Sequence, residues 1–324
     1  TVLAAPSRVA APTAVRTVRI ALAGCGTVGS HLVRLLREHG HEIEAARGLR
    51  FEIVRVLVRD VRRPRAGVPP HALTSDVDAF LATPADVVVE ALGGLDPAAR
   101  VAGHALATGR AFVTANKALV AAHGSELRTL ARGGGVSFSF EAAVAGGVPV
   151  LRVLRDAIVG SDVAAVRGIL NGTTNYILSR MEAGDAFGTA LADAQHRGFA
   201  EADPARDLNG RDAADKLAIL AWLAFGTSPS QVHVATHGLL PDPDALVGAA
   251  RAAGATVRLV AEAVRTPLGL SAAVEPTIVA GNSHFARAAA EENLVEVETG
   301  WCGTLRFTAP YGSSFASLDV HSTN

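Results

Sequence analysis

The sequence predicts an α/β protein built on a doubly wound parallel sheet and followed by a second, α+β domain. Over roughly the first 140 residues, short apolar runs alternate with helical segments, which is the pattern of β-α-β units. A glycine-rich loop joins the first of these strands to the first helix. After Glu141 the pattern changes to long helices and more open strands, so we place a domain boundary there.

The elements of the first domain follow from short apolar runs and from helical spacing. Strands are expected at residues 17–23, 51–58, 86–92, 111–114 and 136–140. Helices are expected at 27–38, 97–108 and 117–132. In the first helix the apolar residues recur at helical spacing, which predicts a shared buried side for Val28, Leu32, Leu35 and Leu36.

The second domain is expected to be richer in helices. These are predicted at residues 147–159, 174–183, 186–197 and 209–225. Strands are predicted at 163–170, 256–265 and 268–275. In the helix at 209–225, burial is predicted for Leu217, Leu220 and Ala221.

Composition and charge argue against several classes of function. The formal net charge of -1 is not that of a nucleic-acid binder. No apolar run reaches the ~18 residues of a membrane span. Cys25 and Cys302 lie far apart without metal-ligand spacing, which fits a reducing compartment. Residues 1–15, rich in Ala, Pro and Val, are expected to be a disordered extension, with a transit-like segment as the alternative.

The glycine loop Gly24-Cys25-Gly26-Thr27-Val28-Gly29 has the pattern G-x-G-x-x-G between a strand and a helix. In this context Gly24 allows the tight turn, Gly26 lets a pyrophosphate approach, and Gly29 lets helix and strand pack closely. The helix N-terminus then offers N–H groups to the phosphates. The loop therefore predicts a dinucleotide site, and the alternative is a tight turn without a ligand.

The end of the second strand normally selects between NAD and NADP. An acid there binds the ribose 2′-OH, whereas an arginine accepts a 2′-phosphate. Arg59, Arg62 and Arg63 favour NADP, while Asp60 leaves NAD open. A solvated basic loop is the alternative.

Lysine is rare in this chain, because 28 of the 30 Lys and Arg residues are arginines. Lys117 follows a predicted strand, and ligand sites lie at the carboxyl ends of parallel strands. Lys216 lies four residues after Asp212 on one helix face, which is usually a surface salt bridge. The rest of that helix is apolar, however, and an amine can transfer a proton whereas a guanidinium cannot. Both lysines are therefore candidates for proton transfer.

Acidic residues cluster just before Lys216. Glu201, Asp203, Asp207 and Asp212 lie within a short stretch and are suited to bind an ammonium group and to orient a general acid. The alternative is a solvated acidic loop with a helix cap.

Taken together, these segments closely resemble homoserine dehydrogenase over most of residues 18–308. The resemblance is carried by long motifs in the right order, GCGTVG, VVVEALGG, FVTANKALVA, EAAVAGGVPV, GILNGTTNYIL and FAEADPARDLNGRDAADKLAILAWLAFG. It implies an enzyme that interconverts L-homoserine and L-aspartate 4-semialdehyde by hydride transfer with NADP or NAD, in threonine and methionine biosynthesis. It also implies a cytoplasmic homodimer or dimer of dimers, with no nucleic-acid or membrane partner and no appended regulatory or kinase domain.

The resemblance implies a division of the chain into an extension at 1–15, a Rossmann-type dinucleotide-binding domain at 16–141, a substrate-binding and dimerisation domain at 142–300, and a C-terminal return to the nucleotide domain at 301–324. Catalytic roles fall to Lys216, Lys117 and Asp212. Substrate binding falls to Glu201, Asp207 and Thr173, although Thr173 and Thr174 by themselves resemble a helix N-cap. Cofactor binding falls to Gly24, Gly26, Thr27, Val28, Gly29, Arg59, Leu92, Gly93 and Lys117. A monovalent cation, Na⁺ or K⁺, is implied at backbone oxygens of the segment that holds Glu141, Val144, Gly146 and Val148, where close packing of small residues is the alternative.

Two departures from the family pattern stand out. Phe199 replaces a tyrosine, which removes one hydroxyl near the substrate. The segment 310–317 barely matches the family run that closes over the nucleotide. The second departure motivates an alternative function, a catalytically inactive nucleotide-binding paralogue with a sensing or assembly role.

Overall fold

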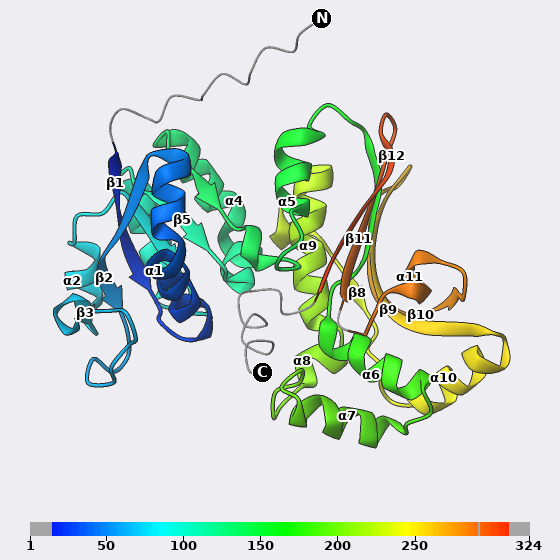
Figure 1. Cartoon of the computed structure of the whole chain (residues 1–324). Coiled ribbons are helices and arrows are strands. Elements are labelled where there is room, and N and C mark those ends of the chain that lie inside the picture. Colours follow the sequence, from blue (N-terminus) through cyan, green and yellow to red (C-terminus); the bar gives the residue numbers. More distant parts are fainter. Residues whose placement is uncertain (1–14, 291, 311–324) are drawn as a thin grey trace, which may run out of the picture. The chain divides into compact units, whose positions relative to one another are not determined.

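The computed structural model describes residues 15–290 and 292–310, and the chain divides into two compact units (Figure 1). The first unit runs to Thr114 and includes residues 127–139. The second comprises residues 115–126 and everything from Phe140 onward. The predicted extension, apart from residue 15, and residues 311–324 of the predicted C-terminal return lie outside the described residues.

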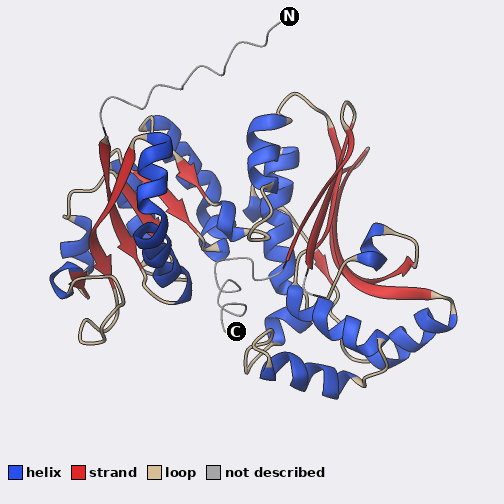
Figure 2. Ribbon diagram, viewed as in Figure 1, coloured by secondary structure: helices blue, strands red, loops and turns tan. Residues whose placement is uncertain are grey.

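The first unit contains a parallel sheet with helices beside it (Figure 2). Its strands are β1 (Arg16–Ala23), β2 (Leu49–Leu57), β3 (Leu73–Thr74), β4 (Val87–Glu90), β5 (Ala111–Thr114) and β6 (Phe138–Ser139). Their order is β3-β2-β1-β4-β5-β6, and every neighbouring pair is parallel. This confirms the doubly wound sheet, whose strand order reverses between β1 and β4. The short strand β3 was not predicted.

The helices of the first unit pack against these strands. They are α1 (Thr27–Arg47), α2 (Val77–Leu81) and α3 (Ala98–Ala107), while α4 (Lys117–Gly133) begins in the second unit and ends in the first. Helix α1 extends beyond residue 38, where the predicted helix ends. The prediction stops there because the second half of α1 is largely polar and exposed and shows no apolar pattern. The predicted burial of Val28 is wrong, since Val28 is 48% exposed. The helix instead approaches the sheet through Gly29 and Val33, which are buried.

The second unit contains a mixed sheet. Its strands are β7 (Val163–Ile169), β8 (Ala235–Thr236), β9 (Ala255–Thr266), β10 (Gly269–Ala280), β11 (Glu292–Thr299) and β12 (Gly303–Pro310). Their order is β12-β11-β7-β9-β10-β8, and all pairs are antiparallel except β8 with β10. The expected α+β character is confirmed. Strands β11 and β12 were not predicted, because each mixes charged and apolar residues in a run that resembles a polar loop.

The second unit contains several helices, one of which is long and apolar. They are α5 (Val150–Arg152), which continues as a π-helical turn (Val153–Ala157), α6 (Gly172–Glu182), α7 (Phe187–His196), α8 (Ala205–Leu208), α9 (Arg211–Phe225), α10 (Pro243–Ala252) and α11 (His284–Arg287). Helix α9 packs on β7, β9 and β10. Its predicted core residues Leu217, Leu220 and Ala221 are fully buried, so α9 is a rigid base for the polar residues of its first turns.

Two segments near the predicted domain boundaries belong to the second unit. The first half of α4, which carries Lys117, belongs to the second unit. Residues 303–310 form β12, which pairs with β11 along its whole length. A continuous row of backbone hydrogen bonds therefore keeps this segment in the second sheet. The predicted domain division stays a prediction. Within the described part of the chain, no helix is long and apolar enough to span a membrane.

Candidate active site

The first unit has a cavity of about 950 Å³ at the carboxyl ends of β1, β2 and β4. These ends flank the point at which the strand order reverses, where doubly wound sheets bind nucleotides. Of the predicted cofactor-binding residues, the cavity is lined by Gly24, Gly26, Thr27, Arg59 and Leu92. Val28, Gly29 and Gly93 are not among its lining residues, although each adjoins one that is.

The glycine loop fits the close approach of a phosphate. A Cβ on Gly24 would lie 2.4 Å from the carbonyl oxygen of Ala91, and φ is +97° there, so only glycine fits this turn. A Cβ on Gly29 would lie 2.1 Å from the carbonyl oxygen of Gly24. Around Gly26, by contrast, none of the described residues places an atom within 4 Å of such a Cβ. The protein itself does not require a glycine at 26, whereas a ligand on the backbone would.

Arginine side chains and one acid follow β2 at the rim of the cavity. The Asp60 carboxylate accepts a hydrogen bond from the Arg62 backbone N–H at 3.0 Å and pairs with the Arg62 Nε at 3.2 Å. Arg59, Arg63 and Arg65 line the cavity together with Asp60. Arg65 donates to the Arg63 carbonyl at 2.9 Å, and within the described part of the chain its buried Nε has no hydrogen-bond partner. The sequence prediction missed Arg65, because it lies beyond the usual position of the cofactor-selecting residue.

A buried carboxylate shapes the loop after β4. Glu90, fully buried at the end of this strand, accepts hydrogen bonds from the backbone N–H groups of Leu92 at 2.7 Å and Gly93 at 3.3 Å. Its second oxygen accepts from the Thr114 hydroxyl at 2.5 Å. Glu90 therefore fixes the predicted cofactor loop to the end of β5. Glu90 was not among the predicted site residues, although an acid at the end of an apolar strand is a recognisable signal.

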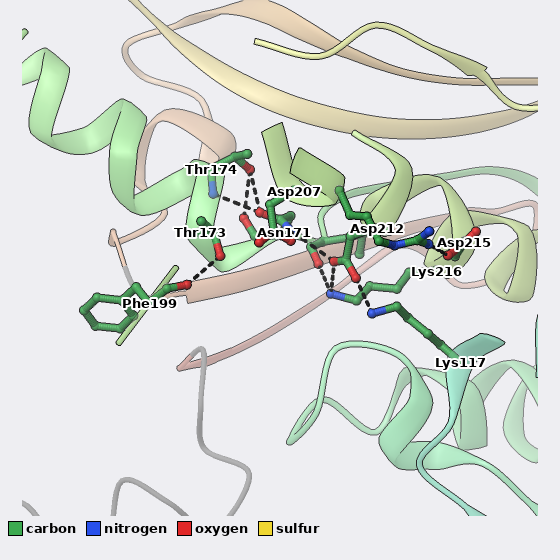
Figure 3. A network of polar contacts seen from close by, with 11 residues as sticks. Lys117, Asn171, Thr173, Thr174, Phe199, Asp207, Asp212, Asp215 and Lys216 are labelled. Atoms are coloured by element: carbon green, nitrogen blue, oxygen red, sulfur yellow. Dashed lines mark hydrogen bonds and ion pairs between the residues drawn. The ribbon is translucent and has the colours of Figure 1, made fainter. Parts of the chain in front are cut away.

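In the second unit, two ammonium groups meet on one carboxylate (Figure 3). Asp212 and Lys216 lie one turn apart at the start of α9, and their Oδ2 and Nζ atoms are 2.8 Å apart. Lys117, the first residue of α4, forms an ion pair with the other oxygen of Asp212. The structure thus brings together the three residues predicted to be catalytic, although Lys117 lies 95 positions before Asp212 in the sequence.

This cluster is not a surface salt bridge. The side chains of Asp212 and Lys216 are 9% and 12% exposed, while that of Lys117 is 34% exposed. Lys216 also donates to the carbonyl oxygen of Leu170 at 2.6 Å, which fixes its ammonium group from a second side. Burial by itself raises the pKa of Asp212, but the charges of Lys216 and Lys117 outweigh it and hold that pKa well below its ordinary value. Asp212 is therefore ionised at neutral pH, between the side chains of Lys216 and Lys117.

Asn171 connects this cluster to Asp207. It lies after β7, where its Nδ2 donates to Asp207 Oδ1 at 2.7 Å and to Asp212 Oδ2 at 2.9 Å. Burial raises the pKa of Asp207, as does the nearby charge of Asp212, while the hydrogen bond from Asn171 lowers it. Asn171 was not among the predicted site residues, and an asparagine before a helix is ordinarily only a cap.

Of the remaining predicted substrate residues, Thr173 lies beside the network and Glu201 does not. Thr173 donates to the Phe199 carbonyl at 2.6 Å and lies beside Asp207. The reading of Thr173 and Thr174 as the N-cap of α6 is wrong, because the cap is Asn171, whose Oδ1 accepts from the Thr174 backbone N–H. Glu201 is exposed, and among the described residues its side chain forms no hydrogen bond or ion pair with the network in Figure 3. Asp203 instead accepts from the backbone N–H of Ala205.

The segment predicted to hold a cation is a tight turn. Glu141 begins a 3₁₀ turn and accepts a hydrogen bond from the Arg152 backbone N–H at 3.0 Å. Val144 and Val148 are buried, and Gly146 is half-buried between them. Between these residues Ala145 has φ of +45°, a strained conformation for a residue with a side chain. The cation itself stays a prediction.

Comparison with known proteins gives one consistent family. Residues 24–141 match the model of the NAD-binding domain of homoserine dehydrogenase, and residues 149–315 match the homoserine dehydrogenase model. Homoserine dehydrogenase of Corynebacterium glutamicum is 41% identical over 297 residues, which cover 90% of this chain and 67% of that protein. The Mycobacterium tuberculosis relative is 40% identical over 299 residues, which cover 90% of this chain and 68% of that protein.

The fold is also found in solved structures. The crystal structure of a homoserine dehydrogenase from Thiobacillus denitrificans superposes with a TM-score of 0.86 at 35% identity, covering 94% of this chain and 72% of that one. Sequence and fold therefore indicate the same family over both units.

Proposed function

The chain belongs to the homoserine dehydrogenase family, and we propose that it is an active homoserine dehydrogenase. It interconverts L-homoserine and L-aspartate 4-semialdehyde with a nicotinamide cofactor, in the route to threonine and methionine. The observation that carries this proposal is the buried cluster in which Asp212 pairs with both Lys216 and Lys117.

In this proposal residues of the chain transfer the proton and bind the substrate. The bound nicotinamide supplies or accepts the hydride. When the aldehyde is reduced, its oxygen needs a proton, and Lys216 provides it as a positioned general acid. Asp212 holds both ammonium groups in place, and Lys117 adds positive charge where the oxygen becomes negative. Asp207 and Glu201 offer carboxylates to the substrate ammonium group, and Thr173 supplies a hydroxyl beside Asp207.

The direct test is the oxidation of L-homoserine by the purified full chain, followed by the absorbance of the reduced nicotinamide. We expect turnover with at least one of NADP and NAD. A folded protein that binds cofactor but turns over homoserine with neither would be the inactive paralogue instead. No observation on the described residues favours that alternative, because the catalytic cluster is intact.

We further propose that the cofactor is NADP rather than NAD. Asp60, the residue that would bind a ribose 2′-OH, is held by Arg62, whereas Arg59, Arg63 and Arg65 line the cavity. Arginine binds phosphate with paired, charge-assisted hydrogen bonds. We expect Arg59→Ala to lower kcat/KM for NADP by about tenfold while changing that for NAD by less than about twofold. Equal losses for the two cofactors would remove the 2′-phosphate role.

We propose a homodimer formed through the sheet face opposite α9. On this face Arg167 pairs with Glu262 and with Glu298, and a hollow of about 270 Å³ adjoins Val260 and Phe285. Arginine and aromatic residues such as these are enriched at subunit interfaces. Sedimentation should give a dimer or dimer of dimers, and Val260→Asp should shift it toward monomer. A monomer in the unsubstituted protein would refute this assembly.

We also propose a cytoplasmic enzyme with a monovalent cation, Na⁺ or K⁺, at the turn from Glu141 to Val148. The free thiols of Cys25 and Cys302 support a reducing compartment. The strained Ala145 supports a ligand, because such backbone persists where the surroundings stabilise it. Replacing Na⁺ and K⁺ by choline at constant ionic strength should lower the activity, and an unchanged rate would exclude a functional cation.

A further inference from the structure

We propose that Asn171 is a positioning residue that holds the substrate-binding carboxylate of Asp207 beside the Asp212–Lys216 pair. This inference rests on the proposed function and adds a residue to its site. Asn171 lies between β7 and α6, and its amide bridges side chains from two further elements, α8 and α9.

The orientation of the Asn171 amide is fixed by its hydrogen bonds. Its oxygen accepts from the backbone N–H of Thr174 at 2.9 Å and from the Thr174 hydroxyl at 3.0 Å. Since that oxygen caps α6, the nitrogen must point the other way, toward the two carboxylates. Asn171 is 2% exposed, so bulk water has little access to its two N–H groups.

The Asn171 amide reduces the repulsion between two neighbouring carboxylates. Asp207 and Asp212 both accept from one nitrogen, so two carboxylates lie close together in a largely buried place. Like charges at such a distance disfavour the ionised forms. The groups that face Asp207 are Asp212 and Lys216 on α9, and Asn171 and Thr173 at the start of α6. Asn171 is the neutral donor that both carboxylates share.

Asn171 also holds the backbone that positions Lys216. The neighbouring carbonyl of Leu170 accepts the Lys216 ammonium at 2.6 Å. Residues 170 and 171 therefore contact Lys216, Asp212 and Asp207 at once. A change at Asn171 should affect substrate binding and proton transfer together, but not the cofactor cavity in the first unit.

The test is Asn171→Ser in the full chain. Serine is also a good N-cap, so it keeps the start of α6, but it is too short to reach the carboxylates. We expect kcat/KM for homoserine to fall about tenfold or more, as for loss of a hydrogen bond to a charged group. The KM for the cofactor should stay within about twofold. The acidic limb of the pH profile should move to higher pH, since Asp207 loses a donor that favours its anion.

Asn175→Ser is the matched control. Asn175 is 1% exposed, lies one turn further along α6, and donates to the backbone carbonyl of Ala289 instead of to the catalytic cluster. It should lower Tm without moving the pH profile. If Asn171→Ser also lowers only Tm, or if Asn175→Ser shifts the profile equally, the positioning role is wrong.

A second measurement separates this inference from the proposed function. In protein labelled with ¹³C at aspartate, the Asp207 carboxyl signal, assigned with Asp207→Asn, reports its titration without any turnover. We expect it to titrate at higher pH in Asn171→Ser than in the unsubstituted protein. An inactive unsubstituted enzyme would overturn the proposed function alone, whereas an unchanged Asp207 titration would overturn the role of Asn171.

Discussion

Replacing Lys216 by arginine tests the proton-transfer role most directly, because the substitution keeps the charge and removes the transferable proton. Arginine still pairs with Asp212, so the buried carboxylate is not left alone, but a guanidinium does not deprotonate in proteins. General acid catalysis contributes about 10²–10⁴-fold to rate, or roughly 2.7–5.5 kcal/mol of barrier. We therefore expect kcat to fall by about 100- to 10,000-fold.

The structure also sets the expected effect on stability. Lys216 is held by Leu170 at 2.6 Å and by Asp212 at 2.8 Å, with only 12% of its side chain exposed. The larger arginine must displace its neighbours, and such overpacking costs about 1–3 kcal/mol. At roughly 2–4 °C per kcal/mol for a unit of about 200 residues, Tm should fall by several degrees while the protein stays folded.

The assay is steady-state homoserine oxidation, with cofactor affinity measured by calorimetry. Cofactor affinity should stay within about twofold, because the cavity residues belong to the first unit. Arg206→Lys is the control, since Arg206 pairs with Asp215 at 2.6 Å on the exposed side of the same region. It should leave kcat within about twofold. A Lys216→Arg enzyme with kcat within tenfold of the unsubstituted one would refute proton transfer by Lys216.

Three further predictions follow from the same geometry. Asp212→Asn should destabilise the protein by about 3–5 kcal/mol in urea unfolding near neutral pH, because it leaves two ammonium groups without their anion. The pKa of Asp212 is depressed in the folded state, so the ionised carboxylate stabilises the fold fully above its unfolded pKa, and this stabilisation is lost as pH falls through the folded pKa. A difference in the free energy of unfolding between Asp212→Asn and the unsubstituted protein that does not narrow in acid would contradict this. Asp207→Asn should raise Tm at neutral pH while weakening homoserine binding, because the pKa of Asp207 is raised and its ionised form is disfavoured in the folded state; a lower Tm would show that its hydrogen bonds outweigh burial. Gly26→Ala should keep Tm within about 2 °C yet weaken cofactor binding about tenfold or more, whereas Gly24→Ala should lower Tm strongly, because only the Cβ at 24 meets the backbone; similar effects of the two on Tm would contradict the phosphate-approach role of Gly26.

The parallel sheet was predictable because each of its central strands is a short apolar run. Leu22 and Val56, for example, are fully buried, and near-continuous apolar runs are typical of parallel strands that are covered on both faces. Elements with mixed polarity were not predictable in the same way. Strand β11 alternates acids with apolar residues, and only its pairing with β7 and β12 explains why it is a strand.

The site was predicted in its residues more than in its geometry. The scarcity of lysine selected Lys117 and Lys216, and helical spacing placed Asp212 beside Lys216. No local pattern indicates that Lys117 shares that carboxylate, because the contact depends on how α4 begins in the second unit. Asn171 and Glu90 were missed for the same reason, since the partners of each are distant in sequence.

By itself the sequence determined the doubly wound sheet, the glycine loop and the family, because these depend on local spacing and on motifs many residues long. The tertiary structure decided which charges are buried together. An acid beside a lysine on a helix is a surface pair or a catalytic pair according to what covers it, and here α9 is packed against the second sheet. The difference is electrostatic, since burial strengthens the interaction of Asp212 with the charges of Lys216 and Lys117, which hold the pKa of that carboxyl well below its ordinary value.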